Sequence, residues 1–399
     1  MNRVYVIGTS DTKSEDLVYV SQEVHKAGVP AVITDISLRL HQHTADILNT
    51  EVAAFHPTTP DFIANDADRG LSGMLMGEAL SAFLRSQDDL GGVIGIGGSG
   101  NTAIITAAMR ELPIGVPKLM VSTMASGDVG GYVGPNDITM MYSVTDVAGI
   151  NPISRVILGN AAHAIAGMVR TPVEQVSQDK PLLGMTMYGV TTPGVTAIQR
   201  QLRDAYDVLV FHATGRGGQS LEKLIESGLI TSIIDLTTTE IVDYLYGGLM
   251  SAGKDRLGAM IRTGIPYVAS VGAFDMITFG SPDQVPPAYR TRLSHRHNAN
   301  ITLVRTTAEE CYESGTWFAQ RINAMKGPVR IILPTGGLSQ LDAPGQPFYD
   351  PEADAALFEA IKKTMQITDD HQVISSPYHI NDPEFAHQVV QYFNQLHPR

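Results

Sequence analysis

This sequence has little cysteine, little positive charge and no long apolar run. Its single cysteine, Cys311, excludes a disulfide within the chain and is typical of a reducing compartment. Lys and Arg number 28 against 41 Asp and Glu, which gives a net charge of −13 and no basic stripe for nucleic acid. No apolar run approaches the roughly 18–20 residues that cross a bilayer, and the opening MNRVYVIGTS has the pattern of a strand, not of a signal peptide. We expect a cytoplasmic protein without a nucleic-acid or membrane partner.

What the sequence has in abundance is glycine, 38 residues, many of them placed directly after short apolar runs. Such runs alternate with helical stretches and predict strands at 3–7, 31–36, 93–97, 118–123, 138–143, 182–189, 207–215, 230–238, 266–274, 301–307 and 329–337. Strands that alternate with helices indicate parallel sheets with right-handed crossovers. The fold class we predict is α/β, with two Rossmann-like doubly wound parallel-sheet subdomains.

The stretch TPVEQVSQDKP is the expected boundary between the two subdomains, because it is polar and has proline at each end. This places an N-terminal subdomain at residues 1–175 and a C-terminal one at 176–399. Within the first, the helix after the opening strand is predicted to begin with a capping box, Thr12 at the N-cap and Glu15 three residues on, and to end at Gly28.

The run GGVIGIGGSGNTAII contains the pattern G-x-G-x-x-G at Gly95, Gly97 and Gly100, between a predicted strand and a predicted helix. Two interpretations stay open. The glycines either allow tight packing of the helix on the strand, or they bring the backbone N–H groups of Ser99, Gly100 and Asn101 against a phosphate or carboxylate. A dinucleotide site is not expected, because the next strand ends without an acidic residue for a ribose. No Lys-Ser/Thr pair follows, so the run is not a P-loop either.

The turn GTSDTKSED is a second candidate anion site. Lys13 falls in the first turn of the predicted helix, where a cation opposes the helix dipole and a bound anion would relieve that cost. Asp11 is a candidate ligand for a Mg²⁺ that bridges phosphates. Asp35, at the end of the next strand, is a candidate partner for a ribose, or else part of a surface turn.

A third polar loop, STMASGDVGGYVG, also follows a strand, and it places the hydroxyl groups of Ser122 and Thr123 at the strand end. The carboxyl ends of parallel strands meet at one edge of a sheet, where ligands bind. Three such loops at one edge favour an anion-binding crevice.

Ionisable residues follow several strands of the second half. His212, Glu240 and Asp275 each come at a predicted strand end, and SHRHN adds His295 and His297. Histidine and carboxylate side chains are suited to general acid–base catalysis near neutral pH. They also ligate metals, although this spacing is not specific, and they also occur as buried polar residues with internal partners.

Together the motifs GTSDTK, GIGGSGNT, STMASGDV, FHATGRGG, DLTTTE, SVGAFDMITFG and YHINDPEFA resemble a known family. It is the ATP-binding domain family of the tomato mosaic virus resistance protein and its bacterial and fungal relatives, and the resemblance covers almost the whole chain. It implies two Rossmann-like subdomains, bound ATP with Mg²⁺, and self-association as a dimer. It also implies phosphate contacts by Thr9, Asp11, Thr12, Lys13, Gly98, Ser99, Gly100 and Asn101, with Ser122 and Thr123 alongside.

Two hypotheses about function follow. In the first, the chain binds ATP and Mg²⁺ on the N-terminal loops, and the nucleotide regulates or stabilises a homodimer or higher homo-oligomer. In the second, the chain is an enzyme for a small carboxylated or phosphorylated metabolite, with His212, Glu240 and Asp275 facing that substrate across a cleft between the subdomains.

Overall fold

The computed structural model describes residues 2–41, 45–63, 68–173 and 180–397. The chain divides into two compact units, Met1–Val176 and Ser177–Arg399, which are treated separately below. The boundary expected between residues 175 and 176 lies outside the described residues.

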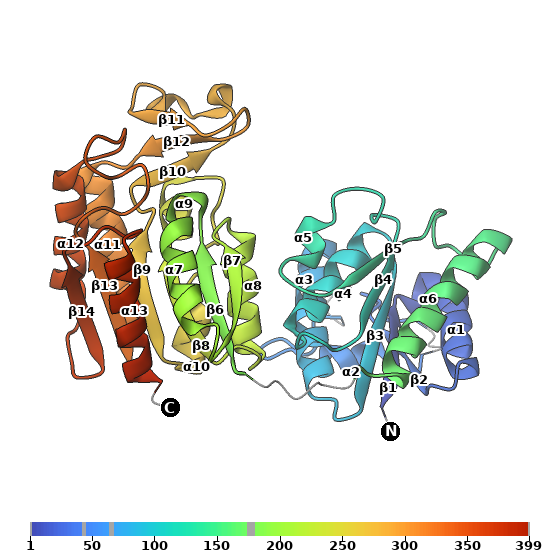
Figure 1. The fold of residues 1–399 in the computed structure, drawn as a ribbon. Coiled ribbons are helices and arrows are strands. Elements are labelled where there is room, and N and C mark those ends of the chain that lie inside the picture. Colours follow the sequence, from blue (N-terminus) through green and yellow to red (C-terminus); the bar gives the residue numbers. More distant parts are fainter. Residues whose placement is uncertain (1, 42–44, 64–67, 174–179, 398–399) are drawn as a thin grey trace. The chain divides into compact units, whose positions relative to one another are not determined.

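The N-terminal unit is a five-stranded parallel sheet in the order β2-β1-β3-β4-β5, with helices on both faces (Figure 1). Alternate residues of β1 point to opposite faces: Val4 and Val6 pack towards α1 and α6, whereas Tyr5 and Ile7 pack towards α3 and α4. Its elements are β1 (Arg3–Gly8), α1 (Ser10–Lys26), β2 (Ala31–Asp35), α2 (Asn49–Ala53), α3 (Arg69–Arg85), β3 (Leu90–Gly97), α4 (Ser99–Glu111), β4 (Lys118–Ser122), α5 (Gly130–Val133), β5 (Thr139–Tyr142) and α6 (Pro152–Arg170).

The C-terminal unit is built on a six-stranded parallel sheet in the order β14-β13-β9-β8-β6-β7. Helices α7 and α13 cover one face, and α8, α10, α11 and α12 cover the other (Figure 1). Its elements are β6 (Leu182–Met187), α7 (Thr192–Leu202), β7 (Asp207–His212), α8 (Arg216–Glu226), β8 (Ser232–Thr237), α9 (Glu240–Tyr246), α10 (Gly258–Thr263), β9 (Tyr267–Gly272), β10 (Met276–Phe279), β11 (Ser294–Arg296), β12 (Thr302–Arg305), α11 (Ala308–Asn323), β13 (Val329–Pro334), α12 (Pro351–Thr364), β14 (His371–Ser376) and α13 (Pro383–Leu396).

The two parallel sheets share one topology. Counted in chain order within each unit, the strands run 2-1-3-4-5, and the C-terminal unit adds a sixth strand at the far edge. This confirms two Rossmann-like doubly wound subdomains. In sheets of this order, ligands bind beyond the carboxyl ends of the first and third strands, where the direction of winding reverses. The relevant pairs are β1 and β3 in the N-terminal unit and β6 and β8 in the C-terminal unit.

One expected strand pairs differently from the prediction. The run 301–307 forms β12, but it pairs antiparallel with β10 and β11 in a separate three-stranded sheet (Figure 1). The connection from β10 to β12 contains two short 3₁₀ helices (Pro282–Gln284 and Pro287–Tyr289) and the strand β11 instead of a crossover α-helix, and so the pair is not a parallel crossover.

The expected start of the first helix is also wrong. Helix α1 begins at Ser10, with Thr9 in the N-cap position, and Lys13 leaves helical geometry at φ −134°, ψ 23°. Residues at and just after the end of β2 stabilise this early start, because Ser10 N–H donates to Asp35 Oδ1 at 2.9 Å and Asp11 N–H donates to the Ser37 hydroxyl at 3.2 Å. The end is as predicted, since Gly28 takes a left-handed φ of +84° just past the helix.

Two further findings concern the chain as a whole. Cys311 is a free, buried thiol. Across the described residues, none of the helices has both the length and the apolar character of a membrane span.

Candidate functional site

A large pocket in the N-terminal unit brings together two of the predicted anion loops. Its volume is about 1510 Å³, above the roughly 300–1,000 Å³ of pockets for drug-sized ligands, so a nucleotide can enter it. The loops lie at the carboxyl ends of β1 and β3, where the topology favours a ligand. They contribute Thr9, Asp11, Thr12, Lys13, Gly98, Ser99, Gly100 and Asn101 to its wall.

The start of α4 leaves backbone donors free towards this pocket. Gly98 occupies the N-cap position and offers no side chain as a cap. Within the described ranges, no residue accepts a hydrogen bond from the N–H groups of Ser99, Gly100 or Asn101. These groups carry the positive end of the helix dipole and together form a site for an anion.

The glycines of this run have different roles. A Cβ atom on Gly95 would lie 2.6 Å from both Ile105 Cγ2 and Met120 Sδ, so Gly95 is required for packing α4 on the sheet. A Cβ atom on Gly97 would lie 2.5 Å from Asn101 Cβ, whereas one on Gly98 would have only Thr123 Oγ1 in contact, at 3.6 Å. Around Gly100 the space is open. The run therefore serves close packing at its start and an open helix terminus at its end.

Asn101 connects the two loops. Its side-chain amide donates to the Thr9 hydroxyl and to the Ile96 carbonyl, both at 3.2 Å. The Thr9 hydroxyl also lies 2.9 Å from the hydroxyl of Thr12. One side chain thus holds the β1–α1 turn against the start of α4.

The backbone of the β1–α1 turn differs from that of the α4 start, because its donors are used within the protein. Asp35 is fully buried, and its carboxylate also accepts hydrogen bonds from the Ser37 hydroxyl and the His41 ring. Burial raises the pKa of Asp35, but the hydrogen bonds from Ser37, Ser10 and His41 outweigh burial and hold the pKa below its ordinary value. The expected contact of Asp35 with a ribose is therefore replaced by a positioning role at the start of α1.

Lys13 also has a partner inside the protein. Its ammonium group donates to the Val147 carbonyl, and its charge lies close enough to Asp16 to lower the pKa of that carboxyl, against the larger opposite effect of burial. These two contacts reduce the electrostatic cost of the Lys13 charge near the start of α1. We had expected a bound anion to reduce that cost. Lys13 remains on the pocket wall.

The third predicted loop supports the pocket without lining it. Ser122 is buried, its hydroxyl lies 2.7 Å from that of Thr102, and it accepts from Met124 N–H. Thr123 N–H donates to the Gly97 carbonyl at 3.3 Å. Neither residue is part of the wall, and we assign both to positioning the start of α4.

Asp11 is the acidic residue of the β1–α1 turn that lines the pocket, and it is exposed there. The described residues contain no group of three or more His, Cys, Asp or Glu that could hold a metal ion. One carboxylate fits a Mg²⁺ that takes its other ligands from phosphates and water, and it does not fit a metal held by protein alone.

The opposite wall comes from α3, which the sequence analysis did not connect with a site. Small residues recur every fourth position along it, at Gly73, Gly77 and Ser81, and all three line the pocket. This spacing gives α3 one small-residue face. It is the signal that would have placed α3 beside the glycine run of α4.

In the C-terminal unit, Glu240 is part of a buried ionic network. The guanidinium of Arg256 contacts Glu240 at 2.9 Å, Asp235 at 2.8 Å and Glu222 at 3.0 Å. Burial raises the pKa of Glu240 to about 7, against the lowering effect of Arg256. Glu240 Oε1 also accepts from the N–H groups of Gly215 and Gly218, at 2.6 and 3.0 Å. Glu240 therefore holds the loop that follows His212 and does not face solvent as a free acid or base.

Asp275 lies in a different buried cluster. Its Oδ2 accepts from the Ser339 hydroxyl at 2.7 Å, and burial, together with the charge of Asp342, raises its pKa to about 7. The predicted trio is thus not one site, since Glu240 and Asp275 are buried in separate clusters, whereas His212 lines a pocket whose wall contains neither of them. The histidines of SHRHN are separated as well: the His295 ring packs 6.5 Å from the Phe348 ring, whereas His297 lines the same pocket as His212.

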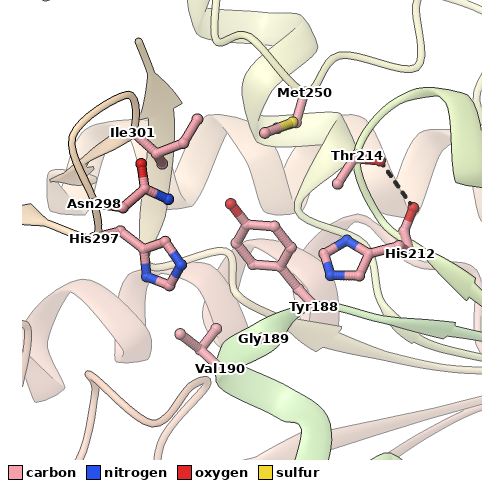
Figure 2. A pocket seen from close by; sticks show the side chains of 9 residues that line it. All are labelled: Tyr188, Gly189, Val190, His212, Thr214, Met250, His297, Asn298 and Ile301. Carbon is pink, nitrogen blue, oxygen red and sulfur yellow. Dashed lines mark hydrogen bonds between the residues drawn. The ribbon is translucent and has the colours of Figure 1, made fainter. Parts of the chain in front are cut away.

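That second pocket has a volume of about 170 Å³ and lies at the carboxyl ends of β6 and β7 (Figure 2). Its wall consists of Tyr188, Gly189, Val190, His212, Thr214, Met250, His297, Asn298 and Ile301.

Comparisons with known proteins place both units in one family. The family model "Uncharacterised protein family (UPF0261) N-terminal domain" matches residues 2–174, and the corresponding C-terminal domain model matches residues 180–397. The chain is 50% identical over 396 residues to UPF0261 protein RA0729 of Rhizobium meliloti (strain 1021), with 99% of each chain covered. It is 41% identical over 389 residues to a UPF0261 protein of Clostridium tetani (strain Massachusetts / E88), with 96% of each covered.

The chain is also 40% identical over 422 residues to the ToMV resistance protein Tm-1(GCR237) of Solanum lycopersicum. This similarity covers 100% of the chain and 56% of the tomato protein, and it confirms the expected resemblance. Among solved structures, a glycosyltransferase of Streptomyces sp. SF2575, SsfS6, aligns with 67% of this chain and 82% of its own, at 12% identity and a TM-score of 0.17, too low to inform function.

Proposed function

This chain belongs to the uncharacterised protein family UPF0261, and from the geometry of its N-terminal pocket we propose that it binds ATP together with Mg²⁺. The observation that carries the proposal is the meeting of two loops, about 90 residues apart in sequence, at the carboxyl ends of β1 and β3. One of these loops presents three backbone N–H groups without an acceptor in the described part of the chain. Such a helix start at a topological switch point is suited to phosphates.

Each wall of the pocket has a part in this proposal. The N–H groups of Ser99, Gly100 and Asn101 would hold phosphate oxygens, with the ammonium of Lys13 adding positive charge. Asp11 would ligate Mg²⁺. Exposed apolar side chains of the wall, among them Phe55, offer a surface on which a purine packs.

The similarity to the tomato protein supports this proposal through the family resemblance, because that resemblance implies bound ATP with Mg²⁺. The name of that protein assigns it resistance to ToMV, and the chain spans 56% of its length. We do not extend viral resistance to this chain. Self-association as a homodimer stays a prediction, and sedimentation with and without nucleotide tests it.

Isothermal titration of the full chain with ATP, ADP and NAD, each with and without Mg²⁺, tests the proposal. We expect saturable ATP binding that Mg²⁺ strengthens, and weaker binding of NAD. Gly98→Val places methyl groups at the open start of α4 and is expected to weaken ATP binding about tenfold or more, which corresponds to about 1.4 kcal/mol. Asp11→Asn is expected to remove the Mg²⁺ effect and to retain metal-free binding.

The matched control is Gly167→Val, because a Cβ atom on Gly167 in α6 likewise has room, with nothing within 4 Å, but Gly167 lies outside the pocket wall. Its ATP affinity should equal that of the unmodified chain. Unchanged ATP binding by a folded Gly98→Val variant, or equal losses in both variants, would contradict the proposal.

A further inference from the structure

The second pocket belongs entirely to the C-terminal unit. Tyr188 follows β6, and His212 ends β7, the strand paired with β6 in parallel. The segment between β11 and β12 contributes His297, Asn298 and Ile301 from the other side (Figure 2). The carboxyl ends of two neighbouring parallel strands thus form the floor of the pocket, as is typical of ligand sites in such sheets.

The two imidazole rings of this pocket are left without hydrogen-bond partners among the residues that the structure describes. Within the described ranges, no hydrogen bond is made by the ring nitrogens of His212 or His297. Figure 2 shows the Tyr188 ring between these two imidazoles, and the Tyr188 and His212 ring centroids lie 5.4 Å apart in an edge-on arrangement. A neutral imidazole presents one donor and one acceptor, so two imidazoles and a phenol can satisfy both a carbonyl oxygen and a neighbouring donor.

The wall contains no Lys, Arg, Asp or Glu. A charged ligand would lose its hydration there without gaining an opposite charge, and that loss costs several kcal/mol. The volume of about 170 Å³ is well below that of pockets for drug-sized ligands, which excludes a nucleotide. Charge and size together favour a small uncharged molecule.

Two buried carboxylates of α9 hold the segments that form the wall. Glu240 accepts from Gly215 and Gly218 N–H, directly after the pocket residue Thr214. Asp243 accepts from the N–H of Met250, at 2.8 Å, and of Thr278 in β10, at 2.7 Å. Removing two carboxylates from water costs free energy. Buried carboxylates that hold the surrounding segments in place are characteristic of preorganised sites.

Burial keeps His212 and Tyr188 uncharged as well. It lowers the pKa of His212, and it raises the pKa of Tyr188, with Asp243 raising it further and the Thr278 hydroxyl lowering it in part. At neutral pH the His212 imidazole is therefore neutral and can accept a hydrogen bond, and the Tyr188 phenol can donate one.

We infer that this pocket is a binding site for a small uncharged carbonyl compound, with the Tyr188 hydroxyl donating to the carbonyl oxygen and the His212 and His297 rings contacting the atoms beside it. Its wall shares no residue with the pocket of the N-terminal unit.

A matched pair of probes tests this inference on the full chain. Isobutyramide and isobutyrate have nearly the same shape, and only the second is charged. With ring-labelled histidine, titration should shift the NMR signals of His212 and His297 saturably with isobutyramide, and isobutyrate should bind about tenfold or more weakly. Tyr188→Phe and His297→Gln should each weaken the amide, whereas His295→Gln, two residues from His297 and outside the wall, should not.

Three results would overturn the inference. One is equal or tighter binding of isobutyrate, and another is the absence of any shift at millimolar isobutyramide. The third is one-to-one Co²⁺ binding that His212→Gln abolishes, which would assign the two imidazoles to a metal. The melting temperature of each variant distinguishes lost binding from lost folding.

Discussion

At the scale of single residues, Arg256 has the largest set of buried ionic contacts in the C-terminal unit. Its side chain is 2% exposed and forms ion pairs with the carboxylates of Glu222, Asp235 and Glu240, which come from three different elements. Removing one member of such a cluster leaves the other charges buried without a partner. We predict that Arg256→Met lowers the free energy of unfolding by about 3–5 kcal/mol. Urea unfolding followed by fluorescence measures this, since Trp317, the sole tryptophan, lies in α11 of the same unit.

The control for this prediction is Arg262→Met. Arg262 also contacts two carboxylates, Glu226 and Asp255, but its side chain is 51% exposed and solvent screens both pairs. Its loss should cost about 1 kcal/mol or less. Equal effects of the two substitutions would show that the buried cluster contributes no more than a surface pair.

At the scale of elements, the junction of β3 and α4 contains glycines with two different roles. Gly95 allows α4 to pack on the sheet, whereas Gly98 leaves the start of α4 open. A Cβ atom on Gly95 has no room beside Ile105 and Met120. We predict that Gly95→Ala destabilises the N-terminal unit by about 1–3 kcal/mol through overpacking. Gly167→Ala, at an open position in α6, should instead stabilise it by up to about 1 kcal/mol through helix propensity. Thermal unfolding followed by circular dichroism compares the two, and equal melting temperatures would contradict the packing role of Gly95.

The elements of the two units show which features could be predicted from the sequence alone. The alternation of strands and helices predicted both sheets, and the glycine run was placed correctly at the carboxyl end of β3. The start of α1 was missed because its capping groups, Asp35 and Ser37, lie about 25 residues away and reach it only through β-sheet pairing. Glu240 resembled a catalytic acid because its partner Arg256 lies in an irregular segment with no pattern to connect them. Local patterns therefore predicted elements and loops, and they failed where a polar partner is brought in by tertiary structure.

At the scale of the whole molecule, the C-terminal unit buries several carboxylic acids with raised pKa values. Burial is the first cause in each case, and the pKa is about 7 for Glu240, Asp243 and Asp275 and about 8 for Asp354. The unfolded chain releases these protons near pH 4, whereas the folded chain keeps them until about pH 7–8. Between these values the folded state binds more protons, and so the free energy of unfolding falls as pH rises.

We predict that the C-terminal unit becomes less stable between about pH 5 and about pH 8, by at most about 1.4 kcal/mol per pH unit for each group. Histidines with lowered pKa, among them His212, oppose this trend below about pH 7, where the unfolded chain still protonates them, and have no effect above it. Asp354→Asn should flatten the dependence, since the amide keeps an oxygen for Arg305 and has no proton to release. Asp283→Asn, at an exposed carboxyl whose pKa is lowered, should leave it unchanged. Urea unfolding at a series of pH values, followed by Trp317 fluorescence, gives the slope. A slope of zero or of positive sign would mean that these carboxyls are ionised in the folded protein and that Arg256 and Arg305 outweigh their burial.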